Sequence, residues 1–315
     1  YRACVEDLER ENGLVRGVFF AYPNKREQEI AHAWMSGVLA HGAGERCDLR
    51  DSTEYVPPDP DIDYVCIIGI RWHSKQIVRE YRAAGKHVLF VDKGYTRARI
   101  LRSGQKRPQY WRISVDEFQP HAYFQQTPRP SDMWDALNIA VKEQIANTGK
   151  GHIVVAGGSL HYAVWHGLKE GERCDPATAW AHETCMALTR VTETRIIYRP
   201  KPSWPDAPEL DIKKIRTSRA NEPLKDLLRS AKLVVTYGSN AGLDALIMGV
   251  PVLTLGDGIT RPMGRNSIAE PWVNNPRFPS DEDRMQFLYD MAYCQFRLGD
   301  MRSGAAWDIL KEQVT

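Results

Sequence analysis

One stretch in the second half of the chain, KLVVTYGSNAGLDALIMGVPVLTLGDG at residues 232–258, constrains the fold more than any other. Its residues 233–237 include two valines and a threonine, which favour a strand buried on both faces. A tight polar turn follows, in which Gly238 relaxes the backbone and Ser239 or Asn240 can cap a helix. The stretch therefore predicts a strand that leads through a turn into a helix.

The rest of that stretch predicts the helix and a second strand. Apolar side chains within residues 243–247 recur at helical spacing, so one face of the helix is apolar. Gly249 can end the helix in a left-handed conformation, and Pro251 comes just beyond it. Residues 252–255 then predict another buried strand. In such a unit of a parallel sheet, the turn after the first strand is where ligands bind.

The composition is that of an ordinary globular protein of 315 residues, with 43% hydrophobic and 26% charged residues. A net charge of +2 does not by itself indicate nucleic-acid binding, and nothing in the sequence indicates an oligomeric state. The six cysteines form no CxxC pair, so we expect reduced thiols in a cytoplasmic protein. We expect no membrane association, because no apolar run reaches membrane-spanning length and no signal-peptide pattern is present.

The first half of the chain predicts one α/β domain, residues 1–130. Strands are expected at GVFFAY, YVCIIGI and HVLFV, which are residues 17–22, 64–70 and 87–91, with helices at 27–39 and up to residue 84. Their order requires right-handed parallel crossovers. Residues 48–63 are acidic and proline-rich and predict a loop. The pair Asp61-x-Asp63 in it precedes a strand, whereas a metal-binding DxD motif follows one, so we expect no metal site.

Residues 93–112, KGYTRARILRSGQKRPQYWR, combine seven lysines and arginines with three aromatic residues and no acid. Such a mixture suits contacts to phosphates together with stacking on bases. A solvated basic surface or a site for a small phosphate-rich ligand would also explain it. The predicted nucleic-acid contacts are Lys93, Tyr95, Arg97, Arg99, Arg102, Lys106, Arg107 and Trp111.

The second half predicts another α/β domain, residues 131–280. Besides the opening stretch, we expect a connecting helix, a strand, a second helix and a further strand, at residues 132–146, 152–156, 177–190 and 195–198. Two amphipathic helices close the chain, near residues 281–298 and 301–313.

Three features at the strand ends of this second domain point to a nucleotide diphosphate. A glycine-rich turn can bring backbone N–H groups to phosphates, a basic loop supplies positive charge, and a helix N-terminus favours an anion. The residues concerned are Gly157, Gly158 and Ser159, Arg199 and Lys201, and Gly238, Ser239 and Asn240. Asp244, early in the following helix, can accept hydrogen bonds from ribose hydroxyls. Alternatively, it is a first-turn acid that complements the helix dipole.

The GGS turn and the later GSNAGLDALIMGVPVL resemble the donor-binding half of GT-B-fold glycosyltransferases. This resemblance covers about residues 150–258, with Asp244 in the place of a ribose-binding acid that is usually Glu in that family. RPKP resembles the loop that holds the donor phosphates, and Asp257 is counted with the donor site. The resemblance implies a GT-B fold, two Rossmann-like α/β domains facing across a cleft, with the C-terminal helices, residues 281–315, returning to the first domain.

The phrases DGITRP, PRFPSDEDR, AYCQFRLGDMRSGAAW and YRPKPSW resemble, more narrowly, phage-encoded glycosyltransferases found near DNA-modification genes. This resemblance implies a UDP-sugar donor and a hydroxymethylated pyrimidine in DNA, such as hydroxymethylcytosine, as the acceptor. The protein would then act in the host cytoplasm. No cofactor is expected beyond the nucleotide-sugar co-substrate.

An inverting enzyme that uses a hydroxyl acceptor needs a general base, whereas a retaining enzyme does not need this one. Asp92, at the end of the HVLFV strand and beside the basic segment, is the first choice. His73, after YVCIIGI, is the second. Both residues could instead be structural, Asp92 as the partner of Lys93 or Arg97.

Two other functions stay open at this point. A GT-B enzyme could act on a cell-surface polysaccharide or on a nucleotide sugar, as an epimerase does, and would have no affinity for DNA. A non-catalytic nucleotide- or nucleic-acid-binding protein would bind its ligand without turnover.

The basic segment gives a first prediction. If residues 93–112 contact DNA, replacing Arg97, Arg99 and Arg102 by Glu weakens DNA binding and flattens its salt dependence, because fewer phosphates are neutralised. UDP binding stays intact. Binding curves at several salt concentrations measure both effects, and an unchanged triple variant would identify the segment as a solvated surface.

Overall fold

The computed structural model describes residues 15–41, 45–54, 57–96, 109–125, 128–144, 151–171, 175–202, 210–219, 221–278 and 280–314. The chain forms two compact units, the first made of Tyr1–Tyr123 and Met291–Thr315, the second of Phe124–Asp290. Each unit has its own sheet and its own hydrophobic core.

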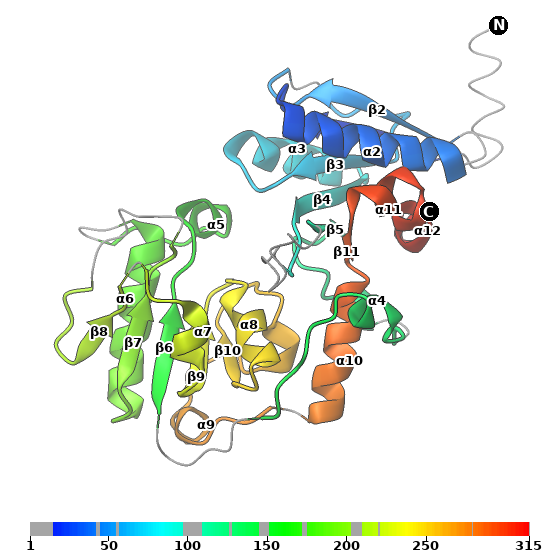
Figure 1. The fold of residues 1–315 in the computed structure, drawn as a ribbon. Coiled ribbons are helices and arrows are strands. Elements are labelled where there is room, and N and C mark those ends of the chain that lie inside the picture. Colours follow the sequence, from blue (N-terminus) through cyan, green and yellow to red (C-terminus); the bar gives the residue numbers. More distant parts are fainter. Residues whose placement is uncertain are drawn as a thin grey trace, which may run out of the picture. The chain divides into compact units, whose positions relative to one another are not determined.

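The sheet of the first unit has six strands in the order β11-β5-β4-β3-β1-β2 (Figure 1). β2, β1, β3 and β4 are parallel, whereas β5 is antiparallel to β4 and β11 is antiparallel to β5. Because four strands are parallel, their carboxyl ends share one edge, which we call the carboxyl edge. The strands predicted at residues 17–22, 64–70 and 87–91 are confirmed. The bounds are Arg16–Ala21 for β1, Arg46–Asp51 for β2, Tyr64–Ile68 for β3, His87–Lys93 for β4, Trp111–Val115 for β5 and Gln295–Phe296 for β11.

Three strands of this sheet were not predicted. The loop expected at residues 48–63 is wrong in its first part, since it overlaps β2, of whose residues only Cys47 is buried. β2 is an edge strand that pairs with β1 alone. Because an edge strand need not be an apolar run, the sequence does not mark it as a strand. β5 begins inside the basic segment, and the two-residue strand β11 is too short for any periodicity.

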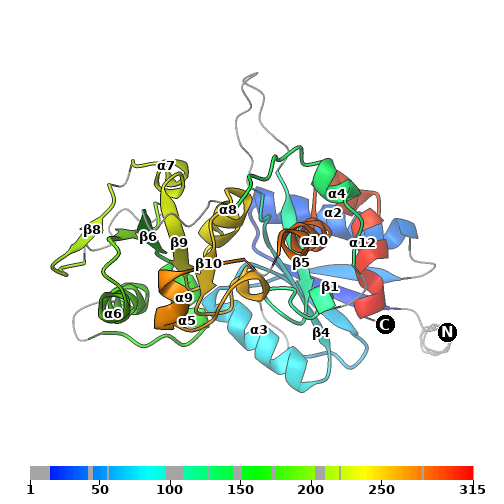
Figure 2. The same ribbon diagram turned by 90° about the horizontal axis from the view of Figure 1, so that it is seen from below.

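Helices cover both faces of the first sheet. α2 (Lys25–His41), α11 (Leu298–Arg302) and α12 (Ala305–Leu310) pack together on one face, and α3 (Trp72–Ala83) packs on the other (Figure 2). The helices predicted at 27–39 and up to residue 84 are confirmed. The two predicted C-terminal helices are wrong in extent: α10 (Asp281–Ala292) ends early, and α11 and α12 replace the second helix. Asp281–Asp290 belong to the second unit, and the first unit resumes at Met291.

The sheet of the second unit is entirely parallel, in the order β10-β9-β6-β7-β8. The predicted strands β6 (His152–Ala156), β7 (Ile196–Arg199), β9 (Ala231–Thr236) and β10 (Val252–Thr254) are confirmed, and β8 (Ile215–Thr217) is an additional edge strand. α6 (Pro176–Val191) and α9 (Glu270–Asn274) contribute to the core on one face. α8 (Ala241–Ile247) packs against β9 and β10, with α7 (Leu224–Leu228) beside it.

The helix predicted at residues 132–146 is wrong. α4 spans only Asp132–Asp135, and residues 139–144 form no helix. Lys142 instead donates its N–H to the carbonyl of Ile247, at the end of α8 (2.9 Å). Gly249, at φ +78°, follows in the predicted left-handed conformation and lies against the Glu143 carbonyl. The segment therefore satisfies a helix end instead of forming a helix.

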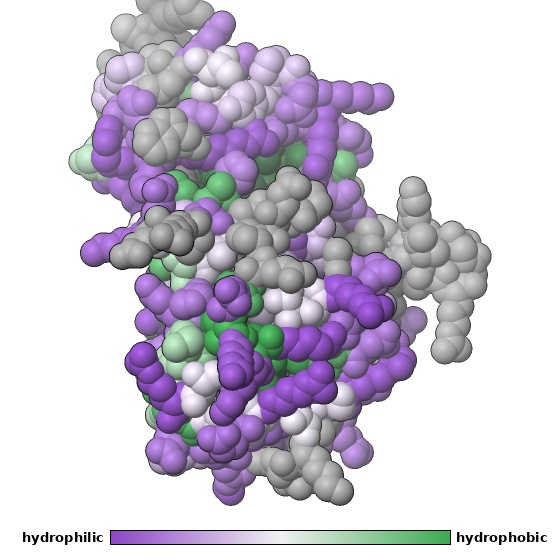
Figure 3. Space-filling view, turned by 90° about the vertical axis from the view of Figure 1, so that its left-hand side faces the viewer, coloured by the Kyte–Doolittle hydropathy of each residue, from purple (hydrophilic) through white to green (hydrophobic). Residues whose placement is uncertain are grey.

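The surface of the described residues is mainly hydrophilic on the face drawn in Figure 3, where hydrophobic side chains gather in a few areas only. Among the described residues, no helix has both the length and the apolar character needed to cross a bilayer.

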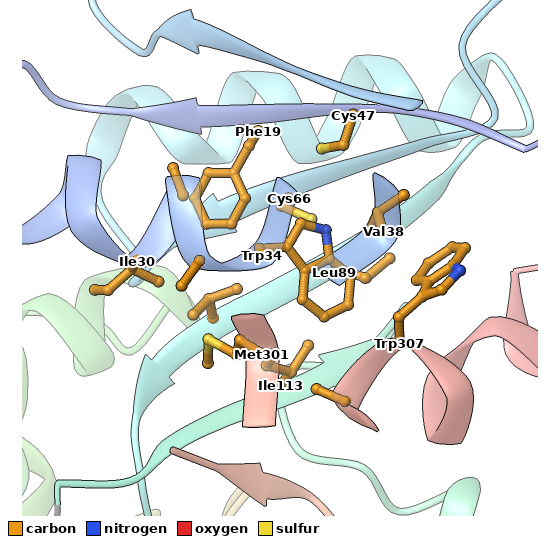
Figure 4. Packing of buried hydrophobic residues seen from close by; sticks show 14 of the residues in the cluster. Phe19, Ile30, Trp34, Val38, Cys47, Cys66, Leu89, Ile113, Met301 and Trp307 are labelled. Carbon is orange, nitrogen blue, oxygen red and sulfur yellow. The ribbon is translucent and has the colours of Figure 1, made fainter. Parts of the chain in front are cut away.

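The first unit's core is built around two tryptophans. Trp34 of α2 meets Trp307 of α12 edge to face, with ring centroids 5.7 Å apart, and Met301 of α11 lies in the same cluster (Figure 4). The ring of Tyr64 lies 5.3 Å from Trp307 and passes over Gly17 of β1. The returning C-terminal segment is therefore part of this core.

Gly17 is expected to be essential for this packing. A Cβ at that position would overlap the Tyr64 ring, and overpacking a filled core costs about 1–3 kcal/mol. Gly17→Ala should therefore lower the free energy of unfolding by that amount in urea titrations. Gly299→Ala, where a Cβ would have no neighbour within 4 Å, is the matched control and should not destabilise the protein. Equal effects of both changes would contradict the packing described here.

Candidate functional site

The second sheet brings three of the predicted donor-binding segments to one place. β6 lies between β9 and β7, and its last residue, Ala156, is paired with Thr236 of β9 and with Arg199 of β7. The three strands therefore end at the same level, at the carboxyl edge of this second sheet (Figure 1). The turns that follow them, residues 157–159, 199–201 and 238–240, are neighbours although they are far apart in the sequence.

The two glycines after β6 have different roles. Gly157 is buried and donates its N–H to the Arg199 carbonyl (2.9 Å). The expectation that this N–H binds a phosphate is therefore wrong. A Cβ there would lie 3.3 Å from the Tyr198 hydroxyl. At Gly158, by contrast, a Cβ would meet nothing within 4 Å. Gly158 is therefore the position at which a ligand can approach this backbone.

Tyr162 connects the turn after β6 to two other turns. It lies on α5 (Leu160–Trp165), whose start is capped by Ser159: the Ser159 Oγ accepts the Tyr162 N–H at 3.3 Å. The Tyr162 hydroxyl donates to the carbonyl of Asp257. A Cβ at Gly238 would overlap the Tyr162 ring, so glycine is required there by close approach rather than by its φ angle.

The start of α8 is largely satisfied within its own turn. Ser239 donates its N–H to the Thr236 hydroxyl (2.8 Å), and its Oγ accepts the N–H of Ala241 (3.3 Å). Asn240 is the N-cap residue but makes no capping bond with its side chain. Two of the N–H groups expected to face an anion are therefore already bonded.

Two predicted acids lie on this edge, and both are half-buried. Asp244 is in the first turn of α8, and Asp257 follows β10. Burial raises the pKa of Tyr237, and the charge of Asp257 raises it further, which places this carboxylate near the phenol. The structure allows both interpretations of Asp244, as a ligand of ribose or as an acid that complements the helix dipole.

The acid beside the basic loop after β7 is bound by another arginine. Arg199 Nη2 donates to the backbone carbonyl of Glu222 (3.5 Å), while the carboxylate of Glu222 accepts two hydrogen bonds from Arg216, at 2.8 and 2.9 Å. These bonds lower the pKa of Glu222. Lys201, two residues beyond Arg199, is half-buried.

A group of aromatic side chains on this edge was missed in the sequence. The rings of Tyr162 and His166 lie 4.2 Å apart, and Tyr237 lies 6.1 Å from Tyr162 and 5.7 Å from Trp180. The only sequence signal was the run LHYAVWH directly after GGS, which is equally typical of a buried helix face.

In the first unit, Asp92 is held by a buried cation. Its Oδ2 accepts from Arg112 Nη2 (3.1 Å), and its Oδ1 accepts the N–H of Lys93 (2.7 Å). The Arg112 side chain is only 6% exposed, lies 4.0 Å from the ring centre of Phe118 and also donates to Gln119 (2.8 Å). The ion-pair partner of Asp92 among the described residues is thus Arg112, while Lys93 contacts it through its backbone N–H and Arg97 lies outside the described residues.

The aromatic residues of the basic segment lie in the protein interior. Tyr95 is 3% exposed and Trp111 4% exposed, so in this arrangement neither ring can stack on a base. Lys93 is exposed at the end of β4. The other predicted contacts, Arg97, Arg99, Arg102, Lys106 and Arg107, lie outside the described residues.

His73, by contrast, lies in a cluster of polar groups at the carboxyl edge of the first sheet. Its Nδ1 is hydrogen-bonded to the Tyr22 hydroxyl (2.9 Å). Tyr22 follows β1, and His73 lies in the first turn of α3, after β3. Burial lowers the pKa of His73 and the Arg71 charge lowers it further, while Glu27 opposes them, so the imidazole is neutral near pH 7.

A buried acid fixes this cluster. The Glu27 carboxylate, 7% exposed, binds Arg71 at 2.5 Å and accepts the N–H of Tyr22 at 3.1 Å. The Arg71 guanidinium lies 4.5 Å from the centre of the Tyr22 ring. Apart from His73, the sequence gave no signal for these residues, because their contact depends on the pairing of β1 with β3.

No group of three or more potential metal ligands is found among the described residues. Asp63, the second acid of the DxD pair, exchanges backbone and side-chain hydrogen bonds with Arg16: its N–H donates to the Arg16 carbonyl, and its Oδ2 accepts the Arg16 N–H, both at 2.8 Å. This acid therefore fixes the start of β1.

Comparisons with known proteins identify the fold. No protein-family model and no curated protein matches the chain. The β-Kdo 2,4 transferase KpsC of Thermosulfurimonas dismutans is similar in structure, with a TM-score of 0.53, 11% identity and coverage of 96% of this chain and 98% of that one. The chain has the GT-B fold.

Two further solved structures are similar at lower scores. The β-Kdo 2,7 transferase KpsC of the same organism has a TM-score of 0.49 and 13% identity, covering 95% of this chain and 99% of that one. The UDP-GlcNAc 2-epimerase of Methanocaldococcus jannaschii has a TM-score of 0.30 and 10% identity, covering 96% and 99%. The assignment of the fold rests on the first match.

Asp244 gives a prediction that separates its two interpretations. If it binds ribose hydroxyls, Asp244→Ala weakens UDP binding by about 1–3 kcal/mol, the cost of unpairing such a group. Asp226→Ala removes a first-turn acid from α7 and is the matched control, with no expected effect on UDP. Calorimetric titration measures both affinities. Unchanged UDP affinity of a folded Asp244→Ala protein would leave only the dipole interpretation.

Proposed function

We propose that the protein is a glycosyltransferase that moves a sugar from a nucleotide-diphosphate donor to a hydroxyl group. The main support is the arrangement at the carboxyl edge of the second sheet, where an open glycine backbone, a basic loop and two half-buried acids lie together. In an open parallel sheet this edge is where ligands bind. The GT-B fold agrees with this proposal.

In this proposal each feature of the edge contacts a different part of the donor. Arg199 and Lys201 bind the diphosphate, whose charge grows as it leaves. Gly158 lets the phosphates approach the backbone, and Asp244 accepts hydrogen bonds from the ribose. A UDP-sugar is the donor that we propose, following the resemblance in the sequence.

His73 is the general base in the proposed reaction. The acceptor oxygen attacks the anomeric carbon, the bond from that carbon to the phosphate oxygen breaks, and the hydroxyl proton passes to His73. We infer that Nδ1 donates to the Tyr22 hydroxyl, which leaves the lone pair on Nε2 to take this proton. Asp92 is less suited, because both of its oxygens already accept hydrogen bonds.

The proposed acceptor is a hydroxymethylated pyrimidine in DNA. Nucleotide sugars labelled in the sugar are incubated with unmodified duplex, with duplex that contains hydroxymethylcytosine, and without DNA. We expect label only in the hydroxymethylated duplex. Label in an oligosaccharide but not in DNA would contradict the DNA acceptor, and conversion of the donor without any acceptor would indicate an epimerase. Binding of the nucleotide without any turnover would contradict the enzyme.

The role of His73 is tested by its effect on rate and on pH dependence. His73→Gln should lower the transfer rate by about 10²–10⁴-fold, the usual contribution of a general base, without changing UDP affinity. Because the pKa of His73 is lowered from 6.5, the wild-type rate should rise with pH to a plateau, and the midpoint of this rise should lie below pH 6.5.

His87→Gln is the matched control. His87 lies at the opposite edge of the same sheet and pairs with Asp116 (2.7 Å). Its replacement should leave the acid limb of the rate profile in place. If Asp92→Asn abolishes transfer in a folded protein while His73→Gln does not, Asp92 is the base.

A further inference from the structure

Three cations from distant parts of the sequence meet at residues 110–111 of the first unit. The Arg26 guanidinium, on the first turn of α2, lies 4.6 Å from the centre of the Trp111 ring. Lys93 is the register partner of Trp111 on β4. The Arg297 guanidinium lies 5.3 Å from the centre of the Tyr110 ring, and its Nε donates to the Tyr110 hydroxyl (2.9 Å). We call Arg26, Lys93 and Arg297 the Trp111 cation group.

The sheet topology explains why these cations gather. α2 begins after β1, Lys93 ends β4, and Arg297 follows β11, whose direction is that of β4 because both are antiparallel to β5. All three therefore lie at the carboxyl edge. Residues paired directly across antiparallel strands point to the same face, so Lys93 shares the face of Trp111, which α2 covers.

The positive charges of the Trp111 cation group are not balanced within the described part of the protein. Arg71 is bound by Glu27 and Arg112 by Asp92, but no carboxylate of the described residues forms an ion pair with a member of the group. Two acids contact the group, but only through backbone N–H groups: Asp300 accepts that of Arg297 and Asp92 accepts that of Lys93, both at 2.7 Å.

The two arginines are also held in place before any ligand arrives. An arginine stacked on an aromatic ring still presents its N–H groups at the edge of the guanidinium plane, where a phosphate can accept them. The Trp111 ring is buried, and the Tyr110 ring is 9% exposed, so both rings are fixed supports. Arg26 and Lys93 are exposed.

We propose that the Trp111 cation group binds backbone phosphates of a DNA acceptor. This deepens the proposed function, on whose nucleic-acid acceptor it rests. Several separate cations, with no ion pair to a described carboxylate, suit a ligand that carries a phosphate at every nucleotide, and duplex DNA has about one charge per 1.7 Å of its axis. The segments that carry Arg26 and Arg297 lie outside the basic run at residues 93–112, so the sequence alone did not indicate them.

The test measures binding of a fluorescent duplex at several salt concentrations, without donor, so that its result does not depend on catalysis. Arg26→Gln and Arg297→Gln should each weaken binding severalfold at 0.1 M salt and reduce the slope of log affinity against log salt by about 1. Arg26→Lys and Arg297→Lys keep the charge, so these variants should retain most of the DNA affinity and most of the salt slope that the glutamine variants lose. Arg82→Gln is the matched control: Arg82 also lies over a ring, Phe90 at 5.5 Å, but at the opposite edge, and its loss should change neither quantity.

Thermal unfolding of each variant separates loss of binding from loss of fold, and the lysine variants restore binding only if charge is what matters. An unchanged slope in both glutamine variants would overturn the proposal, whether or not the wild-type protein transfers sugar. Weakened binding of heparin, as a polysulfated saccharide, with unchanged binding of DNA would also overturn it. If the glutamine variants lose DNA binding but the wild-type protein transfers nothing to DNA, this site stands and the proposed function fails.

Discussion

The pairing of β6 with both β9 and β7 is the constraint on which the candidate donor site depends. Because Ala156 is paired with Thr236 and with Arg199, the three strands end at the same level of the sheet. The turns that follow them therefore begin side by side. A register shift in either pair would separate them. Close packing then fixes the turns against each other, since Gly157 bonds to the β7 loop and Gly238 lies against Tyr162.

In the first unit, buried charged side chains hold the candidate site residues in place. Glu27 is almost inaccessible and is held by Arg71, and it fixes Tyr22 and through it the ring of His73. Arg112 is equally buried and engages Asp92. Removing one partner of such a pair leaves an uncompensated charge, so these pairs are expected to position the edge more firmly than exposed pairs would. A neutral imidazole therefore sits on a rigid support.

The sequence was sufficient for the parallel core of both sheets, because buried parallel strands form apolar runs that alternate with amphipathic helices. It failed for β2, most of whose residues are charged, and for β5, whose alternating apolar residues begin inside the basic segment. It placed the candidate donor residues at the ends of strands that are neighbours in the sheet, but it assigned phosphate contacts to N–H groups that are hydrogen-bonded within the fold, as at Gly157. The cluster around His73 depends on contacts between segments and leaves no local pattern in the sequence.

Amide hydrogen exchange with and without saturating UDP tests whether a nucleotide-diphosphate donor binds at the carboxyl edge of the second sheet. Exchange should slow in residues 157–159, 199–201 and 238–244 and should not change in the edge strand β2 of the first unit. These segments are neighbours only in the folded unit, so their joint protection would locate the ligand. Protection confined to other segments, when calorimetry shows that UDP is bound, would mean that the donor does not bind at this edge.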